Sequence, residues 1–251
     1  PRLSDAAEPM LEAGLVTILV SVALTGPLLD ESASIGSVSP ASIAIVVFYV
    51  AGMMALSRIR QRQPWAVTIS AGDREREQRA TETKEPEVQG KYANALTGRI
   101  VLAFSVASLA TLVAGVALER TGNALANRAG INGAIFGATV LAAVTALPEV
   151  STGIRAVRLG DVGLAMGDIF GGNAAQMVLF LVADLLAGQP VLRSVSTESA
   201  WLALLGIIVT AVYLGGLLLR PEKKIMRMAP ASLTIVVVYA LGVIGLLFLR
   251  Q

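Results

Sequence analysis

Seven stretches of mostly apolar residues alternate with polar segments along the chain. They cover roughly residues 15–29 with some residues before them, 41–57, 100–118, 131–154, 162–187, 201–219 and 233–249. A helix needs roughly 17 to 25 mostly apolar residues to cross the hydrocarbon core of a bilayer, which is the length scale of these stretches. The pattern therefore predicts an all-α, polytopic membrane protein with seven transmembrane helices.

The polar segments between these stretches are unequal in length. Residues 72–90 carry dense charge of mixed sign and almost no apolar side chains. Such a composition is typical of a solvated connector, and a regulatory or partner-binding loop is the alternative. We expect two transmembrane helices in residues 1–58, a charged cytoplasmic loop in 59–98, and five transmembrane helices in 99–251.

Composition agrees with a membrane protein and removes several kinds of chemistry. The 251 residues are 55% hydrophobic and 15% charged, which leaves too little polar side chain to cover a soluble globule. The absence of Cys and His excludes disulfides, thiolate metal sites and the commonest transition-metal ligand. A bound cation must use carboxylate, hydroxyl, amide and backbone oxygens, which suit sodium, calcium, magnesium or protons. The spans hold no convincing pair of acid and base, so we expect neither an enzyme nor a cofactor.

The distribution of charge predicts how the chain crosses the membrane. The net charge of +2 comes from basic residues that lie mainly in the polar segments between the spans. This placement fits contact with a lipid bilayer better than binding of nucleic acid. With the loop after the second span in the cytoplasm, sixteen of the twenty Lys and Arg residues lie inside. The amino end is then inside, the carboxyl end is outside, and we expect a bacterial-type inner (plasma) membrane.

The stretch 131–154 contains polar residues for which a plain membrane anchor has no use. Thr145, Glu149 and Thr152 are spaced by four and three residues, which places them on one face of a helix. Pro148 lacks a backbone N–H, so the carbonyl of Val144 loses its usual partner and the helix bends. An oxygen-lined cation site is one interpretation. A proline kink with a glutamate bonded to a neighbouring helix is the other.

The stretch 162–187 contains a glycine pair that favours a cavity. Gly171 and Gly172 predict a break in the helix, which is tolerated at membrane depth only where the freed backbone faces protein or water. Secondary transporters often coordinate their ions at such breaks. Gln176, one turn after Gly172, is expected to reach the same cavity, and Asn173 to cap or brace the break.

Two aspartates lie in this second stretch. For Asp168, two roles stay open, a residue at the cytoplasmic mouth of the cavity and a direct ion ligand. Asp184 lies near the far end of the stretch and is expected to reach the membrane interface. A carboxylate at membrane depth is costly, so each position is by default a hypothesis of a functional site.

Together the two stretches resemble a known repeat. The residues TALPE at 145–149 and GDIFGGNAAQ at 167–176, joined by a short basic loop, are similar to the second alpha-repeat of the calcium/cation antiporter superfamily. That superfamily includes the sodium/calcium and cation/proton exchangers, and its usual pattern is similar to G-T-S-L-P-E followed by G-N-x-x-G-S-N-x-x-N or D. The similarity is specific over residues 137–176. It implies part of a ten-helix inverted-repeat exchanger, with these seven spans in the places of spans four to ten.

The resemblance assigns roles to five residues. Glu149 matches the central ion-binding glutamate of the repeat, and Thr145 matches its hydroxyl and carbonyl ligand. Ala142 falls where the family offers a backbone oxygen. Gly172 stands where the family usually has a ligand serine, and Gln176 where it has asparagine or aspartate.

Three positions depart from the family pattern. Ala146 replaces the serine after Thr145, Gly172 replaces a second hydroxyl, and Asp168 replaces the asparagine after the first glycine of the second motif. A site that lacks two hydroxyls has fewer oxygens for sodium. The departures therefore raise the alternative of proton coupling through Glu149.

The resemblance implies a secondary antiporter that exchanges Ca²⁺ or a similar cation for Na⁺ or H⁺ by alternating access. The alternative is a non-transporting membrane scaffold or ion sensor that keeps the exchanger fold. Such exchangers hold their ions between two inverted repeats, and the first 130 residues contain no second motif pair. We expect the missing amino-terminal repeat on the same protein or on a second subunit, so the chain supplies half of the ion site.

Overall fold

The computed structural model describes residues 3–62, 97–159, 162–219 and 229–249, most of which lie in helices. Over these ranges there is no β-strand, only an isolated bridge between Ile35 and Val38. Six helices are long and apolar enough to cross a membrane, and a bent pair brings the number to seven. The predicted all-α, polytopic membrane protein is therefore confirmed.

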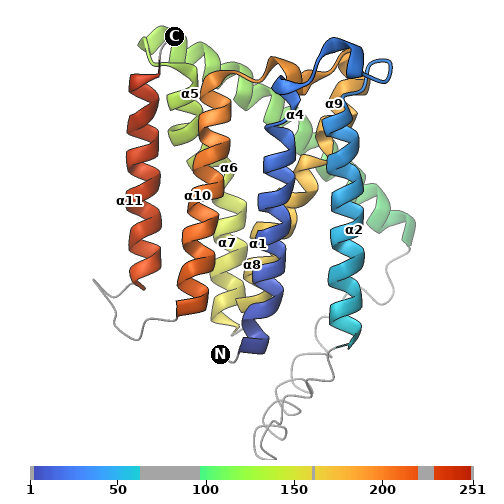
Figure 1. Ribbon diagram of the computed structural model, residues 1–251, viewed down its shortest axis with the longest axis vertical. Coiled ribbons are helices and arrows are strands. Elements are labelled where there is room, and N and C mark those ends of the chain that lie inside the picture. Colours follow the sequence, from blue (N-terminus) through green and yellow to red (C-terminus); the bar gives the residue numbers. More distant parts are fainter. Residues whose placement is uncertain (1–2, 63–96, 160–161, 220–228, 250–251) are drawn as a thin grey trace, which may run out of the picture. The chain divides into compact units, whose positions relative to one another are not determined.

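The helices follow the predicted spans along the chain (Figure 1). They are α1 (Leu3–Ala23), α2 (Pro40–Arg62), α4 (Thr97–Ala129), α5 (Gly133–Phe136), a π-helical turn (Gly137–Leu141), α6 (Ala142–Thr145), α7 (Leu147–Arg158), α8 (Val162–Met177), α9 (Leu179–Ala187), α10 (Thr197–Leu219) and α11 (Pro230–Gly245). Single turns of 3₁₀-helix cover Gly26–Leu28, Glu31–Ala33, Val191–Ser194 and Leu246–Phe248.

The chain divides into two compact units. The first consists of Pro1–Arg62 and Asn132–Gln251, and the second of Gln63–Ile131. In the described part of the second unit, α4 runs for 33 residues, well beyond the predicted span 100–118. It is followed by Gly130, whose φ of 65° is a left-handed conformation that glycine adopts without steric cost.

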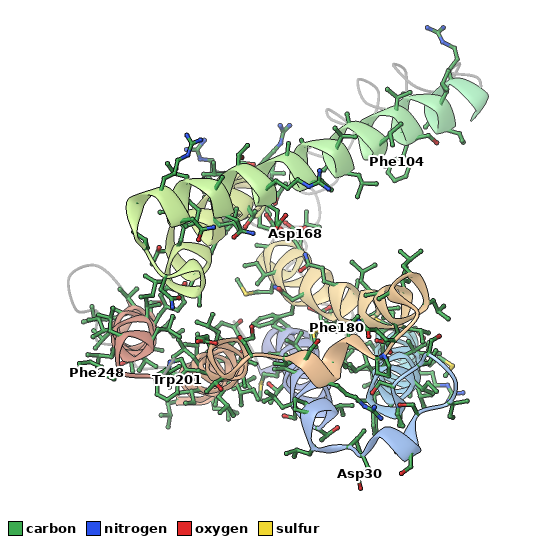
Figure 2. All side chains as sticks on the ribbon, turned by 90° about the horizontal axis from the view of Figure 1, so that it is seen from above. Asp30, Phe104, Asp168, Phe180, Trp201 and Phe248 are labelled. Atoms are coloured by element: carbon green, nitrogen blue, oxygen red, sulfur yellow. The ribbon has the colours of Figure 1, made fainter. Side chains whose placement is uncertain are left out.

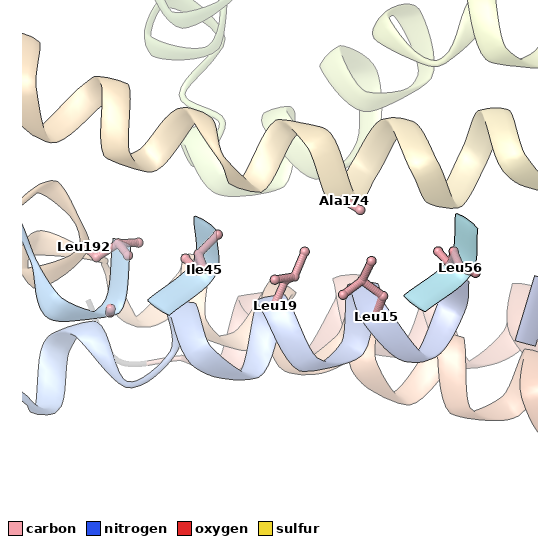
Figure 3. Close-up of a cluster of buried hydrophobic side chains, with 7 residues drawn as sticks. Leu15, Leu19, Ile45, Leu56, Ala174 and Leu192 are labelled. Atoms are coloured by element: carbon pink, nitrogen blue, oxygen red, sulfur yellow. The ribbon is translucent and has the colours of Figure 1, made fainter. Parts of the chain in front are cut away.

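The first unit is assembled around α1. This helix packs against α2, α8 and α10, while α10 also packs against α11 and α7 against α8. Leu15 and Leu19 of α1 meet Ile45 and Leu56 of α2 and Ala174 of α8 in the buried core (Figure 3). Because apolar side chains gain little by leaving lipid, close packing of this kind is what holds membrane helices together.

A buried carboxylate ties together three segments at the end of the unit where α2 begins. Asp184 of α9 is 0% exposed. Its Oδ2 accepts the backbone N–H of Ser39 at 2.9 Å, and its Oδ1 accepts that of Val191 at 2.7 Å. Asp184 is enclosed by protein near the end of α9, because both of its oxygens accept backbone donors. Its expected place at the membrane interface stays a prediction. These contacts define a joint between α2, α9 and the turn Val191–Ser194.

A second set of contacts extends this joint to the loop between α1 and α2. Arg193 donates from Nη2 to the carbonyl oxygen of Asp30 at 2.5 Å and to the hydroxyl of Ser34 at 2.7 Å. Gly26 approaches Leu192 so closely that a Cβ at position 26 would lie 2.6 Å from the Cβ of Leu192. Only glycine fits at that contact without displacing its neighbour.

Candidate cation site

The predicted proline bend is present and is what separates α6 from α7. The two halves of this span meet at an angle of 45°. At the bend, the N–H of Ala146 is shared between the carbonyls of Ala142 and Val144. Pro148 falls in the first turn of α7, where a missing backbone N–H costs nothing because the first turn has no partner for it. The kink and the start of a new helix therefore have one cause.

Glu149 follows this bend directly and lies in the first turn of α7. Its side chain is half-buried. One carboxylate oxygen, Oε2, is buried and has no hydrogen-bond partner among the described residues. The N-terminus of a helix carries partial positive charge, which stabilises a carboxylate in this position. The bend thus presents a buried carboxylate oxygen that has no hydrogen-bond partner among the described residues.

Thr145 and Ala142 lie in the short helix α6 before the bend. The hydroxyl of Thr145 donates to the carbonyl oxygens of Leu141 at 3.0 Å and Ala142 at 3.2 Å. The carbonyl of Ala142 also accepts the N–H of Ala146 at 3.0 Å. These bonds occupy the hydroxyl proton of Thr145 and leave the lone pairs of its oxygen as acceptors. Two predicted ligands are therefore in contact with each other, a few residues before Glu149.

A hydrogen bond between side chains sets the register of α7 against α8. The hydroxyl of Thr152 donates to Oδ2 of Asp168. The two helices run antiparallel, so residue numbers fall along α7 in the direction in which they rise along α8. The residue three positions before Thr152 therefore lies at the same level as the residue three positions after Asp168. Glu149 therefore lies at the level of Gly171, where a Cβ would meet no atom within 4 Å. The glycine lines the cavity between α1, α2, α7 and α8 and leaves open space there.

The predicted break at the glycine pair is wrong. Helix α8 runs without interruption through Gly171 and Gly172 to Met177, and the helix is interrupted at Val178 instead. Glycine in a helix interior costs about 1 kcal/mol relative to alanine. Leaving a backbone N–H and C=O unpaired at membrane depth costs several kcal/mol, so the helix continues across both glycines.

Asn173 and Gln176 also lie in α8, but they line a different cavity from the one that Gly171 and Asp168 line. The Asn173 amide donates to the carbonyl of Ile169 at 2.6 Å, a bond inside its own helix rather than across a break. Both side chains line an apolar cavity of about 460 Å³, together with Met177 and Phe180. Within the described ranges, no hydrogen bond joins Gln176 to Glu149. Their predicted meeting in one site stays a prediction.

A different cavity, of about 720 Å³, lies between α1, α2, α7 and α8. We call it the acidic cavity, because its lining includes the carboxylates Glu8, Glu12 and Asp168 and the hydroxyl of Thr152. Asp168 is labelled on α8 in Figure 2. Glu12 is only 6% exposed, and a Cβ at Gly167 would lie 3.8 Å from each of its carboxylate oxygens. The carboxylate of Glu12 therefore lies against α8 at Gly167.

Glu8 and Glu12 were not among the candidates from the sequence. The apolar pattern placed the start of the first span near residue 15, whereas α1 begins at Leu3. Their spacing of four residues, which puts two carboxylates on one helix face, was the available signal. Among the residues that the structure describes, no group of three or more acidic side chains converges closely enough to hold a metal ion.

Comparison with known proteins gives one match. Residues 99–248 match the family model described as "Sodium/calcium exchanger protein". The match begins near the start of α4 and ends in the last 3₁₀ turn, so it includes the bend, Glu149 and all of α8. No curated protein and no solved structure matches the chain. The chain therefore belongs to the sodium/calcium exchanger family, a family of membrane-embedded cation transporters.

Proposed function

We propose that the protein exchanges Ca²⁺ or a similar cation for Na⁺ or H⁺ across the membrane by alternating access. The observation that carries this proposal is the placement of Glu149. It is a half-buried carboxylate at the N-terminus of a bent helix, with an oxygen that no group in the described part of the chain satisfies. A carboxylate of this kind binds a cation or a proton in turn, which is the chemistry that an exchanger needs.

The remaining ligands of the proposed site are those that the family resemblance indicates, the hydroxyl of Thr145, the carbonyl of Ala142 and the amide of Gln176. In the state that the structure shows, Gln176 lines a different cavity and Ala142 accepts from Thr145 and Ala146, so these two groups would join Glu149 only in another state of the transport cycle. Gly172 and Ala146 supply no side-chain oxygen. A site with so few neutral oxygens favours a proton over several sodium ions as the second substrate, with Glu149 as the group that carries it.

The acidic cavity is the approach to this site from the cytoplasmic side. In the orientation that places most basic residues inside, the start of α1 and the hairpin between α7 and α8 face the cytoplasm. Asp168 then stands at the mouth, where its negative charge attracts cations without binding them tightly. The other half of the coordination comes from an amino-terminal repeat, on the same protein or on a second subunit.

Flux measurements with Glu149→Gln test this function. The full protein is reconstituted in proteoliposomes, and uptake of Ca²⁺ is measured under a sodium gradient and, separately, under a pH gradient. Glu149→Gln abolishes both fluxes at an unchanged melting temperature, because the amide keeps the shape but loses the charge and the titratable proton. Ser151→Ala is the matched control, since among the described residues its hydroxyl bonds only to the carbonyl of Pro148 in the same helix.

The gradients also identify the coupling ion and separate exchange from the alternative role. Uptake under the pH gradient alone assigns proton coupling, and uptake under the sodium gradient alone assigns sodium. A Glu149→Gln protein that transports Ca²⁺ at the normal rate contradicts the proposal. Binding of Ca²⁺ without flux under either gradient supports a scaffold or an ion sensor instead.

A further inference from the structure

A widened turn lies just before the candidate site. The residues Gly137–Leu141 form a π-helical turn between α5 and α6. The N–H of Ala142 bonds to the carbonyls of Gly137 and Thr139. It thereby bypasses the carbonyl of Ala138, which is the partner four residues back that an α-helix would use. Turns of this kind are rare in proteins, and those that occur often lie at functional sites.

The bypassed carbonyl has a partner from another helix. The hydroxyl of Tyr239, on α11, donates to the carbonyl oxygen of Ala138. Ala138 itself is only 8% exposed, so water has little access to this position. In a membrane protein, a carbonyl without a donor is costly, and a tyrosine hydroxyl from a neighbouring helix removes that cost. The contact therefore stabilises the π-helical turn relative to a regular one.

The segment before the turn is held independently. Asn132 caps the start of α5, because its Oδ1 accepts the N–H groups of Ala134 at 2.8 Å and Ile135 at 3.4 Å. Phe136 is buried. With this end fixed, any change in the turn must appear as a rotation of the residues that follow it.

A π-helical turn holds one more residue than an α-helical turn, and each residue of a helix corresponds to about 100° of rotation. Its presence therefore decides which side of the bundle is faced by Ala142, Thr145 and Glu149. We propose that Tyr239 is a positioning residue for the cation site. Its hydroxyl holds the π-helical turn open and so sets the rotation of the three predicted ligands. This inference rests on the proposed function.

Tyr239→Phe tests it, because the variant removes one hydroxyl and keeps the ring. Tyr49→Phe on α2 is the matched control, since that ring packs against the hydrophobic core remote from the site. Two quantities are measured on the full protein. Hydrogen exchange reports the opening of residues 137–146, and Ca²⁺ uptake into proteoliposomes gives KM and kcat separately.

In Tyr239→Phe we expect hydrogen exchange in residues 137–146 to rise about three- to tenfold, the range that corresponds to one lost hydrogen bond. KM for Ca²⁺ rises by a similar factor at an unchanged kcat, while Tyr49→Phe changes neither. A merely structural role would lower the amount of folded protein without changing KM. If Tyr239→Phe shows faster hydrogen exchange in residues 137–146 but an unchanged KM, the proposal is overturned. It is also overturned if both hydrogen exchange and KM stay at the values of the unaltered protein. A third outcome is that the unaltered protein transports no Ca²⁺ while hydrogen exchange still rises in Tyr239→Phe. In that case the proposed function is wrong, and the role of the Tyr239 hydroxyl in holding the π-helical turn is kept.

Discussion

The joint and the acidic cavity hold carboxylates in opposite ways. At the joint, Asp184 is fully buried and each of its oxygens accepts a backbone N–H. In the cavity, Asp168 is exposed and accepts a side-chain hydroxyl, while the deeply buried Glu12 lines open space. Asp168 and Asp184 stand in one apolar stretch of the sequence and belong to the same residue type. Their surroundings show that one fastens segments together and the other lines an open cavity.

Asp184 and Asp168 differ in the kind of group that donates hydrogen bonds to them. Backbone N–H groups are fixed by the helices that carry them, so Asp184 cannot exchange its partners without moving α2 or the turn at Val191. A hydroxyl rotates freely, and Thr152 has other acceptors at 3.2 Å in Pro148 and 3.1 Å in Glu149. A carboxylate bound by such a group can therefore change its partner without moving a helix.

The same substitution at both aspartates gives the largest expected effect. Asp184→Asn turns one acceptor into a donor that faces a buried N–H, so it lowers the free energy of unfolding by about 1–3 kcal/mol. Asp168→Asn keeps an oxygen for Thr152, so it leaves stability nearly unchanged and weakens Ca²⁺ uptake. Thermal melting of the purified protein and flux in proteoliposomes measure the two effects. Equal losses of stability in both variants would show that Asp168 fastens helices as Asp184 does.

Removing the charge of Glu12 tests the cavity more finely. Glu12→Gln keeps the side-chain volume, and we expect KM for Ca²⁺ to rise about tenfold, because a buried charge acts on a cation through a low effective dielectric constant. Glu8→Gln, one helical turn earlier, is the control. Glu8 is less buried, so solvent screens its charge and the expected change in KM is smaller. If Glu12→Gln instead lowers the melting temperature at an unchanged KM, Glu12 fastens helices as Asp184 does.

Two glycine substitutions give the smallest expected effect with opposite signs. Gly171→Ala places a methyl group where no atom lies within 4 Å, so it stabilises α8 by about 0.5–1 kcal/mol. Gly26→Ala forces a Cβ to within 2.6 Å of the Cβ of Leu192 and destabilises the joint. Denaturation of the two variants side by side measures both. A destabilising Gly171→Ala would show that the space at position 171 is filled.

The sequence by itself determined the parts of the molecule that depend on neighbouring residues. Long apolar stretches predicted the membrane helices, since a helix that crosses lipid must be mostly apolar over about 20 residues. Pro148 predicted the bend, because a missing N–H acts within one turn. The motifs around Glu149 predicted the family, and the match over residues 99–248 confirmed it.

Tertiary structure decided what the polar residues contact, because packing brings together residues that are far apart in the chain. Gly171 and Gly172 stay helical since unpaired backbone in lipid costs more than glycine does. Asp184 is a fastening group only because α2 and the turn at Val191 bring N–H groups to it. Glu12 joins Asp168 in one cavity because α1 packs on α8. Such contacts depend on the relative placement of whole helices, which the pattern of a single helix does not specify.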